Sequence, residues 1–143
     1  MRPEIGTILG FTAQRIVMGL GEQGAAYAQG SAGLIAILLG ASAREYERGA
    51  DIRFTENAEI RALFAELAPS VRDANLHKEL LQAAAAKDKS LRISDLNEGN
   101  YALRRLLTRL QIDAETHGAS AARKRIWAVL KAIAERRLVQ LGP

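Results

Sequence analysis

The sequence predicts an all-α protein, a single-domain bundle of five or six helices that covers residues 1–143. Alanine occurs 26 times and leucine 19 times among the 143 residues, whereas valine occurs only four times. Alanine and leucine favour helices, while β-branched residues favour strands. A chain of this length buries one core and is too short for two domains of usual size. The bundle is expected to have a central helix of small residues and a C-terminal helical hairpin.

The first two helices are bounded by proline, glycine and charged residues. Pro3 suits the first position of a helix, because its missing N–H has no partner there anyway. Apolar residues recur after it at helical spacing up to Gly19 and Gly21, which are natural ends. A second, mostly apolar helix is expected from about Gly24 to Arg48.

The middle of the chain predicts a connector and two further helices. Residues 51–55 are expected to form the connector, and Thr55 is a good cap for a helix that Pro69 ends. Ser70 and Asp73 have the spacing of a capping box variant. The helix after them is expected from about Val71 to Lys87.

The last two helices show the clearest pattern. From Ser94 to His117, apolar residues alternate by three and four as positions a and d of a heptad do. Gly118 ends this helix, and Ser120 caps a last helix that reaches Leu138. The short turn between the two predicts an antiparallel hairpin, in which Trp127 is expected to lie in the core.

The segment from Gly19 to Ala43 decides the class of the protein. It holds six of the twelve glycines and a run of 21 uncharged residues, Gln23 to Ala43, which has the length of a membrane span. However, two glutamines, two serines and four glycines leave strongly apolar side chains only between Leu34 and Leu39. Spanning helices carry denser apolar residues and aromatic anchors at both ends. A membrane span is therefore not favoured.

The same segment contains Gly19-Leu20-Gly21-Glu22-Gln23-Gly24, which matches the G-x-G-x-x-G pattern of dinucleotide-binding loops. With residues 16–18 before it and 34–39 after it as strands, this part resembles the first βαβ unit of a Rossmann domain. The resemblance implies a nucleotide or small ligand bound at Gly19–Gly24. It ends near residue 45, and no further strand is evident to complete a parallel sheet. Ligand binding at this loop is kept as an alternative function.

The favoured interpretation makes the segment a helix that packs closely against another helix. Its small residues recur every four positions along one ridge, which we call the small-residue ridge: Gly24, Ala28, Ala32, Ala36 and Gly40. A ridge with almost no side chain lets a second backbone approach closely. A helix that is apolar nearly all round belongs in a bundle or an oligomer interface. In a shorter version of this helix, only residues 33–48 are helical.

The heptad seam offers a second candidate interface, formed by Asn100, Leu103, Leu107 and Leu110. A polar residue at an a position, such as Asn100, often fixes the register between two helices. Equally, Asn100 could lie half exposed near a frayed helix start. The flanking positions lack the alternating charges of a dedicated zipper, so this helix is expected to pair within the bundle, antiparallel to the last one.

Positive charge gathers at the C-terminal end. Residues 100–143 carry nine basic and three acidic side chains, a net charge of about +6. A contiguous basic face would suit an acidic partner, including nucleic acid. The candidate anion or nucleic-acid surface comprises Arg104, Arg105, Arg109, Arg123, Lys124 and Arg125.

No catalytic, cofactor-binding or metal-binding residue is assigned. The chain has no cysteine, which excludes disulfides, thiolate catalysis and cysteine-ligated metals. Asp73 and His77 lie one turn apart, but no third group completes a catalytic set. No signal peptide is evident. The sequence therefore predicts a soluble, cytoplasmic assembly protein that acts as a homodimer, with nucleic-acid binding and ligand binding as alternatives.

Overall fold

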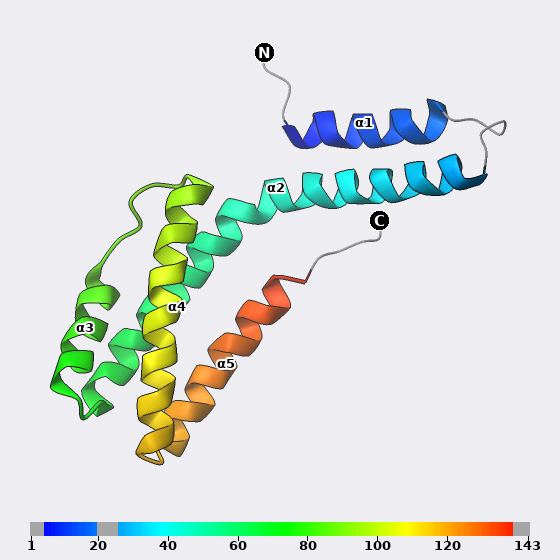
Figure 1. Cartoon of the computed structure of the whole chain (residues 1–143). Helices are drawn as coiled ribbons and strands as arrows, with labels where there is room; N and C mark the ends of the chain where they lie inside the picture. Colours follow the sequence, from blue (N-terminus) through cyan, green and yellow to red (C-terminus); the bar gives the residue numbers. More distant parts are fainter. Residues whose placement is uncertain (1–4, 20–25, 139–143) are drawn as a thin grey trace. The chain divides into compact units, whose positions relative to one another are not determined.

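The computed structural model describes residues 5–19 and 26–138. These residues form five α-helices and no strand (Figure 1), which confirms the predicted all-α class. Contacts divide the chain into two compact units, residues 1–49 with 139–143 and residues 50–138. That all 143 residues form one domain stays a prediction.

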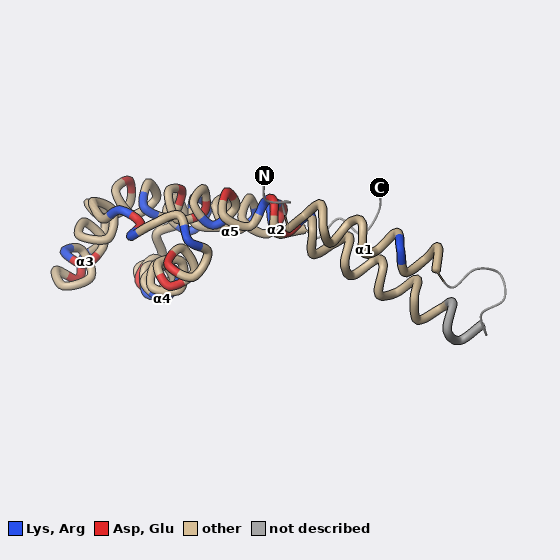
Figure 2. Tube along the Cα trace, turned by 90° about the horizontal axis from the view of Figure 1, so that it is seen from above, with Lys and Arg blue, Asp and Glu red and all other residues tan. Residues whose placement is uncertain are grey.

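In the first unit, helix α1 (Ile5–Gly19) lies alongside the first part of helix α2 (Ala26–Leu67), as Figures 1 and 2 both show. The two helices approach closely at Gly6. A Cβ placed on Gly6 would lie 2.9 Å from Oε1 of Glu47 and 3.7 Å from the carbonyl oxygen of Ala43. A larger residue here would displace the Glu47 carboxylate, the far end of a flexible side chain, while the backbone contact to Ala43 is an ordinary one.

Two alternatives for the glycine-rich segment are wrong. Residues 16–18 and 34–39, the strands of the Rossmann-like alternative, are helical, and α2 is already helical at Ala26, before the short helix of residues 33–48 would begin. The proposed start at Pro3 and most of the Gly19–Gly24 loop lie outside the described residues.

Helix α2 also continues through residues 51–55, so the predicted connector and the Thr55 cap are wrong. The helix continues here because one face of α2 is buried on both sides of residue 55. Ile52, Glu56 and Ile60 are spaced by four, and none of them is more than 2% exposed. Pro69 lies in a short 3-10 helix, η1 (Ala68–Ser70), that follows directly on α2.

The second unit packs the rest of α2 with helices α3 (Ala74–Ala85), α4 (Ile93–Thr116) and α5 (Ser120–Arg136). The cap of α3 is Asp73, whose carboxylate accepts hydrogen bonds from the backbone N–H groups of Asn75 and Leu76. Ser70 instead donates to the carbonyl of Leu67. The core of this unit consists of Ile60, Leu63, Phe64, Leu67, Ala68, Val71, Leu76, Leu80, Leu103, Leu107, Leu110, Ala114, Ala122, Ile126, Val129 and Ile133.

Helices α4 and α5 form the predicted C-terminal hairpin (Figure 1). Gly118 joins them with φ of 65°, a left-handed conformation that favours glycine. The N–H of Ala119 donates to the carbonyl of Ala114 at 2.9 Å and closes the end of α4.

Candidate functional site

The structure separates the two predicted interfaces. Of the small-residue ridge, Gly24 and the Ala28 side chain lie outside the description, while Ala32 is buried. Ala32, Ala36 and Gly40 share the face of α2 that carries Ala43 and Glu47, since all are spaced by three or four. That face meets α1 at Gly6. Of the ridge itself, a Cβ placed on Gly40 would meet only the Arg44 side chain of α2, so no close approach of α1 is seen at this ridge position.

The heptad seam lies inside the second unit. Its residues Leu103, Leu107 and Leu110 are between 1% and 5% exposed and belong to the core. Asn100 is 2% exposed, so the half-exposed alternative for it is wrong. These four residues contact other helices of the same chain.

Asn100 belongs to a buried polar cluster that ties three helices together. Its Nδ2 donates to Oδ1 of Asn57 at 2.9 Å and to Oε2 of Glu56 at 3.2 Å. Arg137, at the end of α5, donates from Nε and Nη2 to the two Glu56 oxygens at 2.6 and 2.5 Å. Arg104 of α4 lies 3.7 Å from the same carboxylate. Glu56 is fully buried, and its charge is met by two guanidinium groups.

These contacts keep Glu56 ionised. Burial alone raises the pKa of the Glu56 carboxyl, but the hydrogen bond and charge of Arg137, the charge of Arg104 and the Asn100 hydrogen bond outweigh it, so the pKa lies below its usual range. The burial of Glu56 was not predicted from the sequence. Acidic residues usually lie on the surface, and the partners that allow this one to be buried are distant in the chain.

A second cluster fixes the segment between α3 and α4. Asp88 accepts hydrogen bonds from Nη1 and Nη2 of Arg61 at 3.1 and 2.8 Å, and from Nδ2 of Asn57 at 2.9 Å. The Arg61 hydrogen bonds, opposed by burial and supported by Asn57, lower the pKa of Asp88. A Cβ on Gly99 would lie 3.3 Å from Oδ1 of Asp88, so this glycine lets the carboxylate approach α4.

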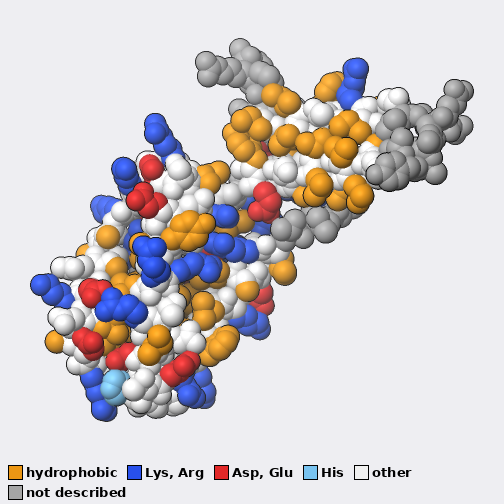
Figure 3. Space-filling model, viewed as in Figure 1, with side chains coloured by type: hydrophobic (Ala, Val, Ile, Leu, Met, Phe, Trp, Pro, Cys, Tyr) orange, Lys and Arg blue, Asp and Glu red, His pale blue; other side chains and the backbone are white. Residues whose placement is uncertain are grey.

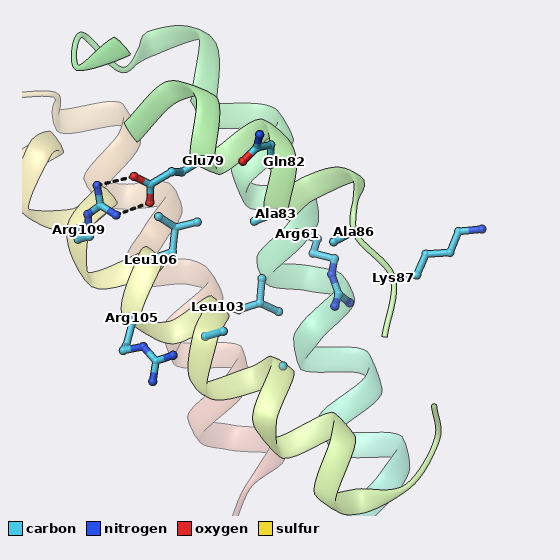
Figure 4. Close-up of a pocket in the computed structure, with 12 residues that line it drawn as sticks. Arg61, Glu79, Gln82, Ala83, Ala86, Lys87, Leu103, Arg105, Leu106 and Arg109 are labelled. Atoms are coloured by element: carbon cyan, nitrogen blue, oxygen red, sulfur yellow. Dashed lines mark hydrogen bonds and ion pairs between the residues drawn. The ribbon is translucent and has the colours of Figure 1, made fainter. Parts of the chain in front are cut away.

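Between α3 and α4 lies a groove of about 720 Å³, within the size range of small-ligand sites (Figure 4). Its floor is apolar and built largely from small residues. Arg109 and Glu79 pair across it, and Figure 4 shows the Lys87 side chain pointing away from it. Nε of Arg61 is buried in its wall without a hydrogen-bond partner among the described residues. The groove gathers no set of free charged groups around a point where chemistry would take place.

The Asp73 and His77 side chains do not form a pair. Asp73 caps α3, while Nδ1 of His77 lies 2.8 Å from the carbonyl oxygen of Ala68. Within residues 5–19 and 26–138, no group of three or more histidine, aspartate or glutamate side chains is placed to hold a metal ion.

The predicted basic face is largely matched by carboxylates from other helices. Arg104 pairs with Glu56, Arg109 with Glu79, and Arg125 with Glu66. Figure 3 accordingly shows blue and red side chains interleaved over the second unit. Among the six predicted cations, only Arg105, Arg123 and Lys124 have no ion pair within the described part of the chain. Beside two of these lies Trp127, which is 60% exposed and not in the core as predicted.

Two stretches of the first unit, residues 5–19 and 30–43, are almost uncharged, and the unit exposes apolar side chains. Arg15 is the only charged residue within residues 5–19 and 30–43, and most of α1 and the first part of α2 are tan in Figure 2, the colour of residues without charge. No residue of α1 is buried. Figure 3 shows apolar side chains spread over this unit, and its exposed large ones are Ile5, Ile8, Phe11, Val17, Met18, Leu34, Ile35, Ile37, Leu38 and Tyr46.

Three of these apolar residues form a compact edge on α2. Leu34, Ile37 and Leu38 are 65%, 48% and 64% exposed, and their spacing of three and four places them on one side of the helix. At 100° per residue, this side lies opposite the small-residue ridge that faces α1. We call these three residues the α2 outer edge.

Comparisons with known proteins assign this chain to no family. No protein-family model matches the chain, and neither the curated proteins nor the solved structures contain a match. No helix within the described residues is both long and apolar enough to cross a membrane.

Proposed function

We propose that this protein is a helical assembly protein that forms homodimers through the α2 outer edge. The observation that carries the proposal is the exposure of Leu34, Ile37 and Leu38 on a helix with no charge between residues 30 and 43. The described part of this unit consists of two helices, and these three side chains are not buried between them. A partner surface of the same character removes them from water.

A second copy supplies a surface that matches this edge. In a two-fold symmetric dimer the same patch is used by both copies, so the patch must be complementary to itself. An uncharged stripe of leucine and isoleucine at spacings of three and four meets that condition, because it brings no like charges together. Pairing α2 with α2 of the partner places α1 of each copy on the outside of a four-helix layer.

The contribution of the edge sets the size of the expected effect. Leu34 and Leu38 are each about two-thirds exposed, and removing each from water contributes roughly 1 kcal/mol. A dimer contains four such leucines, so replacing both positions removes about 4 kcal/mol. The dissociation constant is then expected to rise about a thousandfold.

Sedimentation velocity over a range of protein concentrations tests the proposal. The wild-type protein is expected to form dimers, and the Leu34→Gln/Leu38→Gln double variant to remain monomeric at the same concentrations. Leu91→Gln is the matched control, because Leu91 is 69% exposed but belongs to the second unit.

Two results would show the proposal to be wrong. The first is a wild-type protein that stays monomeric at every concentration, and the second is dimerisation that survives the double substitution. Flotation with neutral lipid vesicles addresses the other possible occupant of the edge. Vesicle binding by a protein that remains monomeric would assign the α2 outer edge to a lipid surface instead.

A further inference from the structure

Helix α5 exposes the only tryptophan of the chain. The helix buries Ala122, Ile126, Val129 and Ile133 on one side, spaced by three and four as a core-facing stripe should be. Trp127 lies off this stripe and is 60% exposed. Burying an indole is strongly favourable, so an indole left in water on a well-packed helix calls for a partner outside the core.

Positive side chains surround this indole on the helix surface. Arg123 and Lys124 lie one turn before Trp127, and Lys131 lies one turn after it, at the spacings that make helix neighbours. The side chains of Arg123 and Lys124 form no ion pair or hydrogen bond within the described part of the chain. Lys131 pairs with Glu135 at 3.7 Å, and both of these side chains are largely exposed.

This set differs from most of the other cations of α4 and α5, although Arg105 of α4 also has no ion pair within the described residues. Arg104, Arg109, Arg125, Arg136 and Arg137 each meet a carboxylate of another helix. Around Trp127, by contrast, the positive charge is not matched by another helix. An exposed aromatic ring and unmatched positive charge therefore coincide on one face of α5.

We propose that Trp127, Arg123, Lys124 and Lys131 form a contact site for single-stranded nucleic acid. The indole stacks on an unpaired base, which is sequence-tolerant because every base presents a π-face. The cations one turn before and one turn after the ring lie about 11 Å apart along the helix axis and bind phosphates on either side of the stacked base. This site belongs to the second unit and is independent of the proposed homodimer.

The composition of the face favours nucleic acid over a lipid surface. A helix that lies on a membrane inserts a broad apolar face with several large residues. On α5, Trp127 is the only large apolar side chain among the exposed ones. One aromatic ring flanked by cations suits stacking with phosphate contacts, and an intact duplex offers no unpaired base for the ring.

The lone tryptophan provides the readout, because the chain contains no other. Titration with a single-stranded oligodeoxythymidylate at low salt is expected to quench its fluorescence. Three phosphate contacts give a salt slope of about −2, so the affinity is expected to fall about twentyfold between 50 and 200 mM salt.

Variants separate stacking from charge. With a labelled oligonucleotide and anisotropy detection, Trp127→Leu is expected to weaken binding about tenfold or more. Arg123→Gln/Lys124→Gln is expected to weaken binding and to reduce the salt slope to about −0.7. The charge-matched control, Lys87→Gln/Lys89→Gln on the segment between α3 and α4, is expected to retain the affinity and slope.

Three results would overturn the inference. One is the absence of quenching at low salt, and another is an affinity that Trp127→Leu leaves unchanged. The third is equal quenching by vesicles of anionic lipid, which would assign the face to a membrane surface. All the substituted side chains are exposed, and circular dichroism of each variant confirms that it is folded.

Discussion

Replacing Glu56 with glutamine is expected to destabilise the second unit by about 3–5 kcal/mol, the usual cost of removing one partner from a buried ion pair. The Glu56 carboxylate is fully buried and accepts two hydrogen bonds from Arg137 and one from Asn100. Glutamine keeps the shape of the side chain but removes its charge. Its amide NH₂ group donates hydrogen bonds, so it cannot accept one from the N–H groups of Arg137. Both Arg137 and Arg104 then lose their counter-charge.

Thermal and denaturant unfolding, both followed by circular dichroism, measure this loss of stability. For a unit of this size, each kcal/mol shifts the melting temperature by about 4–8 °C, so a drop of at least about 12 °C is expected. Glu66→Gln is the matched control, because the Glu66 and Arg125 side chains are 45% and 50% exposed. Exposed pairs contribute less than about 1 kcal/mol. If the two variants unfolded at the same denaturant concentration, the reasoning about the buried cluster would be refuted.

Three further predictions concern pH and local structure. Folding lowers the pKa values of the Glu56 and Asp88 carboxyls below their ordinary values of 4.5 and 3.8. The ionised carboxylates therefore stabilise the fold fully at any pH above these ordinary values. This stabilisation is lost as the pH falls through the lower pKa values of the folded state. Melting temperatures measured from pH 7 to pH 3 should therefore drop at the acid end, and less steeply for Glu56→Gln; parallel curves would contradict this. Gly118→Ala forces alanine into φ of 65° and is expected to cost about 1–2 kcal/mol in denaturant unfolding, whereas no loss would mean that the turn rearranges. Asp73→Ala removes the cap of α3 and is expected to cost about 1 kcal/mol, with Asp73→Ser as the conservative control that retains most of the stability.

The C-terminal hairpin was predictable because its signals are local. The heptad spacing of Leu103, Leu107 and Leu110 defines the buried side of α4, and Gly118 marks the turn. Such patterns lie within a few residues of each other and need no knowledge of the partner helix. The same applies to Pro69 at the end of α2, since proline cannot donate the hydrogen bond that continues a helix.

The continuity of α2 was missed because one of its core positions is charged. Between Ile52 and Ile60, the buried face contains Glu56 and Asn57, both fully buried. Their partners come from α4, α5 and the segment before α4, between 31 and 81 residues further along the chain. Contacts at that separation leave no periodic pattern in a single sequence, so the buried face could not be followed from Ile52, inside the predicted connector of residues 51–55, into the helix predicted after Thr55.

The partners of the candidate cations and the exposure of Trp127 could not be predicted for the same reason. From the sequence, Arg109 and Arg125 are predicted to be available to an anion. In the structure they form ion pairs with Glu79 and Glu66 on other helices. Trp127 is predicted to lie in the core, because an aromatic residue at helical spacing from apolar residues is usually buried. Only the packing of α5 reveals that the indole lies beside the buried stripe and not within it.

Cysteine cross-linking tests the proposed dimer most directly, because the native chain contains no cysteine that would interfere. Two single variants, Leu34→Cys and Leu38→Cys, place a thiol on the α2 outer edge, and Leu91→Cys is the equally exposed control in the second unit. In a two-fold dimer only a residue close to the axis faces its own copy, and if the axis passes through the short α2 outer edge, at least one of the two positions lies within reach of a disulfide. Mild oxidation is predicted to give a covalent dimer from an edge variant and little from Leu91→Cys. No cross-linked dimer from either edge variant, or equally rapid cross-linking of the control, would contradict assembly through the α2 outer edge.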